Sequence, residues 1–359
     1  MDQIYNTVTM LALMEEVPQT PAFFKDRYFP TGAGDLYKTE YVLTQFRKAS
    51  RTMAKLVAPD VGDIPLERGG FTMDRYAPPR VAPSRTLTVD DLAKAGWGEA
   101  PYATLTPEER QYRIAIDDLS DLERAIAYRE EWLCAKVMIE NGFTEDAYAD
   151  DVTPVDKYDL KYYAGLSSEH LYTVSPVWST FALMAEDVSA MADSLTDRGL
   201  AAEDLLLGTD AAAAALGFED FRKLLDKNSG IITGEIAAKM TAYKGVVYLG
   251  QVNFNGHILN VFSVREGYAE KQQNGTIITQ RFFPAKSALV TAPNCGHMAY
   301  AAVTQINRGQ ENFSTIAGTR IPKLVVDDDN EVRKLRMTSR PLPMPVTHSP
   351  WVYAANVVS

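Results

Sequence analysis

The most regular alternation of apolar and polar positions begins at Thr106 and predicts a long helix. Thr106-Pro107-Glu108-Glu109 provides an N-cap, a proline at the first helical position and a capping box. Apolar residues then recur at steps of three and four up to Asn141, and Gly142 provides a C-terminal stop. At about 1.5 Å per residue, a helix over residues 107–141 would be on the order of 50 Å long. One small core can hardly surround such a helix, so we expect it to form a spine.

A second amphipathic helix is predicted between Ser175-Pro176 and Arg198-Gly199. Its apolar positions alternate steps of four and three, at Val177, Phe181, Met184, Val188, Met191 and Leu195. This seam could form a coiled-coil dimer, but packing onto a sheet or helix of the same chain is favoured.

The chain beyond residue 204 predicts a mixed α/β module. Leu205-Leu206-Leu207 is a candidate buried strand, and Asp210 is expected to cap an alanine-rich helix, which an amphipathic stretch follows. Further strands are expected at residues 246–249, 258–262, 276–279 and 288–291. Asn255-Gly256 and Asn274-Gly275 are strong signals for tight turns between strands.

The first ninety residues contain too few regularly spaced apolar positions to form a core of their own. Residues 1–56 contain an aromatic cluster at 23–30 and several prolines and glycines, which predicts an extended arm. The aromatic rings must be buried on the chain's own body or on a neighbour. Residues 57–89 alternate apolar and polar positions around Arg68-Gly69-Gly70, as in a long two-stranded excursion with a glycine-marked bend. An isolated hairpin is marginal in water, so a neighbouring subunit is the natural candidate to hold it.

Composition and charge exclude several classes of protein. Hydrophobic residues make up 46% and charged residues 23% of the 359 residues, which is ordinary for a folded soluble protein. Neither a long apolar run nor a basic N-terminal region is present, so we expect no membrane span and no secretory signal. The formal net charge of −11 argues against a protein whose main function is to bind phosphate groups, as in nucleic acids. Acidic residues are in excess between Glu108 and Asp210, which would suit copies that dock on each other, although solvated faces are the default explanation.

No catalytic or metal-binding constellation stands out. Cys134 and Cys295 are far apart, and the four histidines are isolated from one another. Gly32-Ala33-Gly34 lacks the third glycine and the flanking strand and helix of a phosphate loop, so a simple turn is favoured. Residues 321–359 predict a strand, an acidic turn and a second strand, and that turn lacks the glycine and the distal glutamate of a calcium loop. We therefore predict no active site, no cofactor and no metal site.

Several strings along the chain, taken in order, resemble the major capsid proteins of bacteriophage lambda and its relatives. They are Phe23-Phe24-Lys25, Arg68-Gly69-Gly70-Phe71-Thr72, Pro79-x-Val81-x-Pro83, Tyr243-Lys244-Gly245, Phe283-Pro284, Pro322-Lys323 and Ser339-x-Pro341-Leu342. The long charged helix lies at the matching place, and the likeness covers nearly the whole chain. Each string is weak alone, but their order and spacing make the resemblance specific.

The resemblance implies an α+β fold of the HK97 capsid type. It divides the chain into an N-terminal arm (1–56), an extended β-hairpin loop (57–95), a peripheral domain with the spine helix (96–204), an α/β axial domain (205–320) and C-terminal strands that return to the peripheral domain (321–359). The arm and the loop would then be held by neighbouring subunits, which explains why they lack partners of their own.

The function implied by the resemblance is that of the major capsid protein of a tailed bacteriophage. Copies would assemble as hexamers and pentamers into an icosahedral head around double-stranded DNA, in the host bacterial cytoplasm. The expected partners are further copies of the chain, a scaffolding protein, a portal, a decoration protein and the packaged DNA, which would be bound non-specifically. Two alternatives stay open: a nanocompartment shell of the same fold, and a soluble α/β enzyme with an unrecognised site.

The candidate intersubunit contacts lie in four segments: the aromatic arm, the bend of the loop, the glycine-containing segment after the second amphipathic module, and the acidic turn. They are Phe23, Phe24, Arg27, Tyr28, Phe29, Arg68, Gly69, Gly70, Phe71, Asn228, Ser229, Gly230, Asp327, Asp328 and Asp329.

Overall fold

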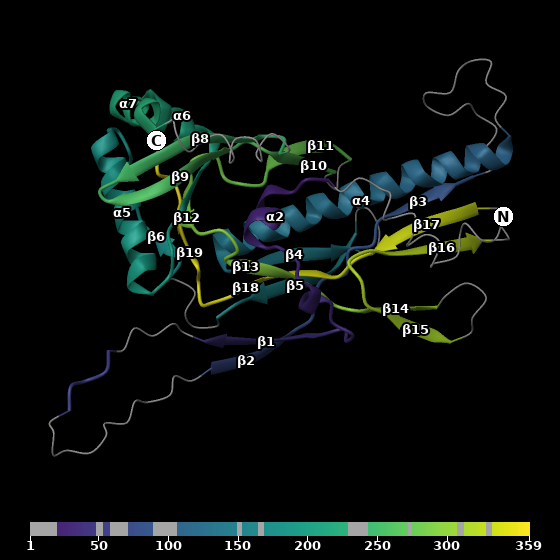
Figure 1. Ribbon diagram of the computed structural model, residues 1–359. Helices are drawn as coiled ribbons and strands as arrows, with labels where there is room; N and C mark the ends of the chain where they lie inside the picture. Colours follow the sequence, from purple (N-terminus) through teal and green to yellow (C-terminus); the bar gives the residue numbers. More distant parts are fainter. Residues whose placement is uncertain are drawn as a thin grey trace.

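Helix α4 (Pro107–Glu140) runs along one half of the molecule, and a six-stranded sheet forms the other half (Figure 1). The computed structural model describes residues 20–47, 53–57, 71–88, 106–148, 153–163, 169–228, 243–271, 275–306, 312–327 and 332–359. Buried apolar side chains form three clusters: one between the two halves, one around the six-stranded sheet and one along the middle of α4. Mixed helices and sheets make this an α+β fold, as predicted.

The predicted spine helix is confirmed with its N-terminal cap. The backbone N–H of Glu109 donates to the Thr106 hydroxyl at 3.3 Å, and the Glu109 carboxylate accepts from the Thr106 N–H at 2.9 Å. The helix has 34 residues and ends at Glu140, because Asn141 adopts the left-handed conformation with φ of 53°. Asparagine tolerates that conformation better than most residues. Gly142, which was expected to end the helix, instead begins the next strand.

A three-stranded antiparallel sheet packs on the N-terminal part of α4. Its order is β16 (Ile321–Asp327), β17 (Val332–Thr338) and β3 (Ser84–Leu87). Leu119, Leu122 and Ile126 of α4 are buried against Leu324, Leu335 and Met337 of the sheet. The two strands predicted for the tail are therefore confirmed, whereas the third strand comes from the segment expected to form the extended loop.

Short two-stranded elements surround the C-terminal part of α4. They are the pairs β4 (Gly142–Tyr148) with β5 (Pro154–Lys161), β13 (Gly296–Tyr300) with β18 (Pro341–Pro345), β14 (Val303–Ile306) with β15 (Phe313–Ile316), and β10 (Gly267–Lys271) with β11 (Ile277–Arg281). Each pair is antiparallel. The pair β13–β18 lies against α2 (Phe23–Tyr28) and α4, so it ties the arm to the spine helix.

The six-stranded sheet brings together strands that are far apart in the chain. Its order is β6 (Leu171–Tyr172), β19 (Trp351–Ala354), β12 (Ala288–Thr291), β7 (Asp204–Leu207), β9 (His257–Val264) and β8 (Val246–Phe254). The pairs β7–β9 and β19–β6 are parallel, and the other three are antiparallel. All four residues of β7, β12 and β19 are buried, which is typical of central strands covered on both faces.

Three helices accompany this sheet: α5 (Phe181–Asp197), α6 (Thr209–Gly217) and α7 (Glu219–Asn228). The seam of α5 packs on the sheet of its own chain, as favoured over a coiled coil. The helix starts later than predicted, because the Thr180 hydroxyl caps it, so Val177 lies outside it. The N-cap of α6 is Gly208, not Asp210, because the Gly208 carbonyl already accepts the first helical hydrogen bond, from the N–H of Ala212. A side chain at position 208 would lie 2.2 Å from the Pro284 carbonyl oxygen.

The extended hairpin is a two-stranded ribbon of β1 (Val42–Arg47) and β2 (Phe71–Tyr76) that lies apart from both sheets (Figure 1). The ribbon differs from the predicted excursion within residues 57–89, because its first strand comes from the segment expected to be arm. The predicted bend at Arg68-Gly69-Gly70 lies outside the described residues. Gly32-Ala33-Gly34 lies in a short turn around the 3-10 helix η1 (Ala33–Asp35), as favoured.

We predict opposite effects for alanine at two glycines. A Cβ at Gly142 would lie 2.1 Å from the Leu160 carbonyl oxygen, so Gly142→Ala must displace the β4–β5 pair from the end of α4. We expect a loss of about 1–3 kcal/mol in the free energy of unfolding, measured by urea denaturation. Gly217→Ala, where a Cβ meets nothing within 4 Å, should gain about 0.5–1 kcal/mol. Equal effects of the two variants would contradict the close approach at Gly142.

Candidate assembly surfaces

The aromatic residues of the arm are buried inside their own protomer. The side chains of Phe23, Phe24, Tyr28 and Phe29 have at most 1% of their surface exposed. Phe23 contacts the rings of Tyr243 and Phe262, and Phe29 contacts Trp351 of β19. Intrachain packing therefore accounts for these four rings, which were expected to contact a second subunit. No ring surface is left over for a neighbour.

Helix α2 places two basic side chains on buried carboxylates of different halves. The Lys25 ammonium lies 2.8 Å from the carboxylate of Glu130 on α4. Arg27 donates two hydrogen bonds, at 2.6 and 2.8 Å, to Asp204 at the start of β7. The Tyr28 hydroxyl also donates to Asp204, at 3.0 Å. The short arm helix thus links the spine helix to the six-stranded sheet through charge-assisted hydrogen bonds.

Glu131 of α4 caps α2 from outside the arm. Its carboxylate accepts from the backbone N–H of Phe24 at 2.7 Å and from that of Lys25 at 3.1 Å. Burial raises the pKa of Glu131 to about 8, although these two hydrogen bonds favour the ionised form. Burial also raises the pKa of Glu266, which lies near Glu131, to about 7.

Arg320 forms the centre of a buried ionic network. Its guanidinium donates to the carboxylates of Glu123 and Glu130, and the Tyr300 hydroxyl donates to Glu130 at 2.9 Å. Burial by itself would raise the pKa of Glu130, but the charges of Arg320 and Lys25 outweigh it, and the pKa is lowered. Glu130 is therefore ionised and satisfied by three side chains.

The apolar pattern of α4 contained a signal for this network. Glu130 stands where the three-and-four stepping between Ile126 and Leu133 calls for an apolar residue, whereas Glu123 directly follows Leu122, which completes the stepping there. Both carboxylates are buried. The network escaped prediction because its cation, Arg320, lies about 190 residues further along the chain.

The β1–β2 ribbon is anchored on one face and open on the other. Val42 and Thr44 of the inner face are buried, and the ring of Tyr76 lies 5.1 Å from that of Tyr162. On the outer face, Leu43 is 60% exposed and Met73 is 55% exposed. Successive residues of a strand point to opposite faces, so one side of the ribbon holds it to the body and the other offers apolar surface.

Other exposed apolar side chains lie on the two-stranded elements at the periphery. Phe313 of β15 is 73% exposed and Ile277 of β11 is 69% exposed. Single exposed apolar side chains are normal on a protein surface, so these two residues carry no argument for an interface.

The remaining predicted contact residues divide into three groups. Arg27 is paired with Asp204, as described above. Phe71 is the first residue of β2, Asn228 is the last of α7, and Asp327 is the exposed last residue of β16. The others lie outside the described residues and are Arg68, Gly69, Gly70, Ser229, Gly230, Asp328 and Asp329. An intersubunit role for these residues stays a prediction.

The described part of the chain holds no group of three or more histidine, cysteine, aspartate or glutamate residues placed to bind a metal ion. Within the same residues, no helix is both long and apolar enough to cross a membrane. Cys134 and Cys295 are buried free thiols, and burial raises the pKa of Cys295 to about 12.

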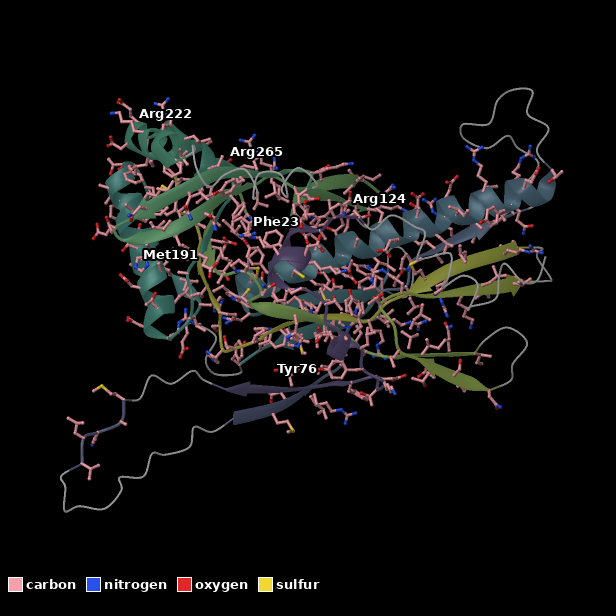
Figure 2. All side chains as sticks on the ribbon, viewed as in Figure 1. Phe23, Tyr76, Arg124, Met191, Arg222 and Arg265 are labelled. Atoms are coloured by element: carbon pink, nitrogen blue, oxygen red, sulfur yellow. The ribbon has the colours of Figure 1, made fainter. Side chains whose placement is uncertain are left out.

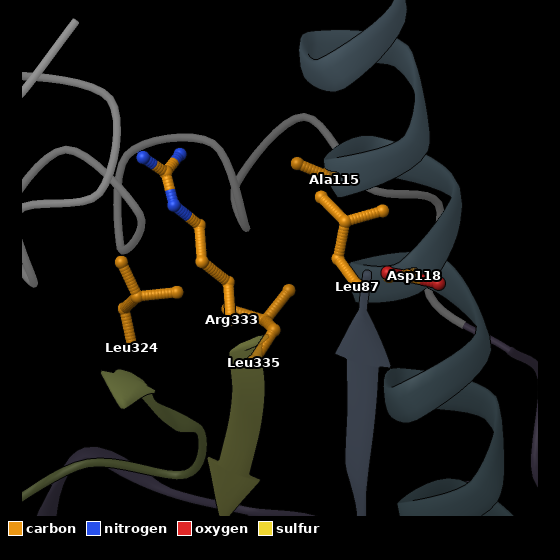
Figure 3. A pocket seen from close by; sticks show the side chains of 6 residues that line it. All are labelled: Leu87, Ala115, Asp118, Leu324, Arg333 and Leu335. Atoms are coloured by element: carbon orange, nitrogen blue, oxygen red, sulfur yellow. The ribbon is translucent and has the colours of Figure 1, made fainter. Parts of the chain in front are cut away.

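Figure 3 shows a small hollow between α4, β3 and β17 lined by Leu87, Ala115, Asp118, Leu324, Arg333 and Leu335. Four of these six residues are apolar, and Asp118 and Arg333 are the two charged residues of the lining.

A family model described as phage major capsid protein E matches residues 6–356. The chain belongs to this family. The family of phage major capsid proteins is structural and not enzymatic, which removes the α/β enzyme from the alternatives. The match is to a capsid family and also disfavours the nanocompartment shell.

Solved structures of low sequence identity share the fold of this capsid protein. A prophage protein of Escherichia coli CFT073, described as a capsid protein, is 18% identical with a TM-score of 0.67, and the match covers 98% of each chain. A phage-related protein of Bordetella bronchiseptica RB50 is 11% identical with a TM-score of 0.50, over 96% of this chain and 95% of that one. The capsid of Ralstonia phage GP4 matches at 11% identity and a TM-score of 0.48, over 95% and 92%. No curated protein sequence matches the chain.

The fold of this major capsid protein is therefore of the HK97 type, as the resemblance implied. As a member of a major capsid protein family, the protein associates with copies of itself into a shell and is a component of the virion.

We predict that the ionic network is costly to break. Arg320→Leu leaves Glu123 and Glu130 buried without their main cation and should lower the free energy of unfolding by about 3–5 kcal/mol in urea denaturation. Arg85→Leu is the control, because Arg85 and its partner Asp121 are both exposed. It should cost about 0–1 kcal/mol. A similar cost for both variants would contradict the importance of the buried network.

The raised pKa of Glu131 predicts that the free energy of unfolding depends on pH. Its pKa is about 8 in the folded protein and 4.5 ordinarily, so the folded state binds an additional proton between these values. Its contribution to stability is complete below pH 4.5 and is lost as the pH rises through 8. Glu131→Gln should therefore gain stability relative to wild type between pH 5 and pH 8, measured by denaturation of unassembled subunits. Glu140→Gln, an exposed control, should keep the wild-type slope, and a wild-type slope in Glu131→Gln would contradict the raised pKa.

Proposed function

We propose that this capsid protein assembles as hexamers and pentamers into an icosahedral head that encloses double-stranded DNA. Assembly takes place in the host bacterial cytoplasm, on a scaffolding protein and around a portal. The shell forms as a rounder precursor and expands as DNA enters, and a decoration protein clamps it. The membership of the family supports this proposal, and the exposed β1–β2 ribbon is the feature of the chain that carries it.

The ribbon supports the proposal because Val42 and Thr44 of its inner face are buried against the body, whereas Leu43 and Met73 of its outer face are exposed. Leu43 and Met73 would lose their exposed apolar surface if a neighbouring subunit covered them. A two-stranded ribbon is marginal by itself, so contact in trans also stabilises its strands. Each interface in a closed shell can be weak, because every subunit is held at several interfaces at once.

The domain boundaries form part of the proposal. We assign residues 1–56 to the arm, 57–95 to the extended loop, 96–204 to the peripheral domain, 205–320 to the axial domain and 321–359 to the returning strands. These boundaries follow the family resemblance. The apolar cluster around the six-stranded sheet crosses the boundaries at 204 and 320, because α5 and β19 pack in it together with β7 and β12. Arg68 to Phe71, Asn228 to Gly230 and Asp327 to Asp329 are proposed contacts between subunits.

A substitution on the outer face of the ribbon tests the proposal. Leu43→Asp/Met73→Asp adds charge where a neighbour would cover apolar surface, so we expect folded subunits with wild-type melting temperature that form no closed particles. Particle formation is followed by light scattering and negative-stain electron microscopy. Removing residues 64–80 would be less informative, because it deletes β2 and the packed ring of Tyr76.

The control is Leu43→Met/Met73→Leu, which keeps the surface apolar and should assemble as wild type. Normal particles from the aspartate variant would contradict a docking role for the ribbon. A wild-type protein that stays monomeric with its fold intact would contradict the shell itself.

A further inference from the structure

The sheet β16–β17–β3 carries basic residues on the face that points away from α4. Lys323 of β16 lies directly opposite Arg336 of β17, and Ser84 of β3 lies opposite Arg336 on the other side. Like charges directly opposite each other on neighbouring strands destabilise a sheet. Such an arrangement lowers the stability of the isolated protomer unless an anion lies between the two side chains.

Two further basic residues extend this face. Lys334 is two residues from Arg336 on the same strand, so its exposed side chain points to the same side. Arg80 lies beside Val81, which bridges to Ser339 just after β17. Burial and the charges of Arg336 and Arg80 lower the pKa of Lys323, and burial and Arg80 lower that of Arg336. Lys323, Arg336 and Arg80 are therefore close enough to repel one another.

The basic face lacks acids of its own. Lys323, Arg336, Lys334 and Arg80 form no ion pair with any described residue, and the shielded Nε of Arg336 has no hydrogen-bond partner there. Asp327 is the acid at the far end of β16, four residues from Lys323 and thus about 13 Å away along the strand. By contrast, Arg85 on the opposite face of the sheet pairs with Asp121 of α4.

We propose that this basic face, formed by Lys323, Arg336, Lys334 and Arg80, binds carboxylates on the surface of a second copy of the chain. The proposal rests on the proposed self-assembly. The chain has 47 acidic and 36 basic residues, so any neighbouring copy offers an excess of carboxylates. Among the described residues, Asp146 and Asp156 on the β4–β5 pair are examples of exposed carboxylates without an ion pair. Nucleic acid is the less favoured anion, because the net charge of −11 repels phosphates from the chain as a whole.

Lys323→Gln/Arg336→Gln tests the proposal with two readouts that should move in opposite directions. Removing the mutual repulsion should keep or raise the melting temperature of the unassembled subunit. The critical concentration for particle assembly should rise about tenfold at low salt, and its dependence on salt should weaken. Arg222→Gln/Lys286→Gln, which removes two exposed and unpaired charges elsewhere (Arg222 is labelled in Figure 2), should assemble as wild type.

Two further measurements separate the explanations. Lys323→Arg/Arg336→Lys keeps both charges and should assemble as wild type; failure of this variant would overturn the proposal by showing that shape matters and charge does not. Wild-type assembly by Lys323→Gln/Arg336→Gln at low salt would also overturn it. So would binding of a generic DNA duplex that the glutamine variant loses while it assembles normally. If the wild type itself forms no particles, the proposed function has failed, whereas normal wild-type particles isolate the test to this face.

Discussion

The relative position of the two halves depends on buried ions that α2 and Arg320 bring together. Glu130 of α4 and Asp204 of β7 are both fully buried, and each would be costly without its partners. Lys25 and Arg320 satisfy the first carboxylate, and Arg27, Tyr28 and Asn260 satisfy the second. Because α2 is six residues long, displacement of the arm would remove Lys25 from Glu130 and both Arg27 and Tyr28 from Asp204 at once. The same contacts therefore place the arm, the spine helix and the sheet.

Local patterns in the sequence predicted the elements that local interactions form. The capping box at Thr106, the stepping of apolar residues in α4 and α5, the run Leu205–Leu207 and the Asn255-Gly256 turn are each complete within a few residues, and each is confirmed. Element boundaries were less certain where a tertiary contact decides them, as at Gly208 beside the Pro284 carbonyl.

Pairings between distant segments could not be predicted in the same way. The alternation in residues 57–89 correctly indicated strands, but it contains no information on their partners, which proved to be β1 for β2 and β17 for β3. The aromatic arm posed the same difficulty, since its composition shows that the rings are buried but not where. The predicted contacts between subunits had the same difficulty. A single sequence indicates which turns and glycines are exposed. Whether a second subunit covers them depends on the geometry between chains, which the sequence does not contain.

The position of β19 in the sheet has a consequence for synthesis. This strand lies between β6 and β12, and its Trp351 donates to Asn141, a residue 210 positions earlier in the chain. During synthesis, the site that Trp351 occupies beside Asn141 therefore stays empty until residue 351 has been translated. Closing contacts of such separation is slow. A chain that stops before β19 therefore lacks a central strand of the six-stranded sheet and the hydrogen bond from Trp351 to Asn141.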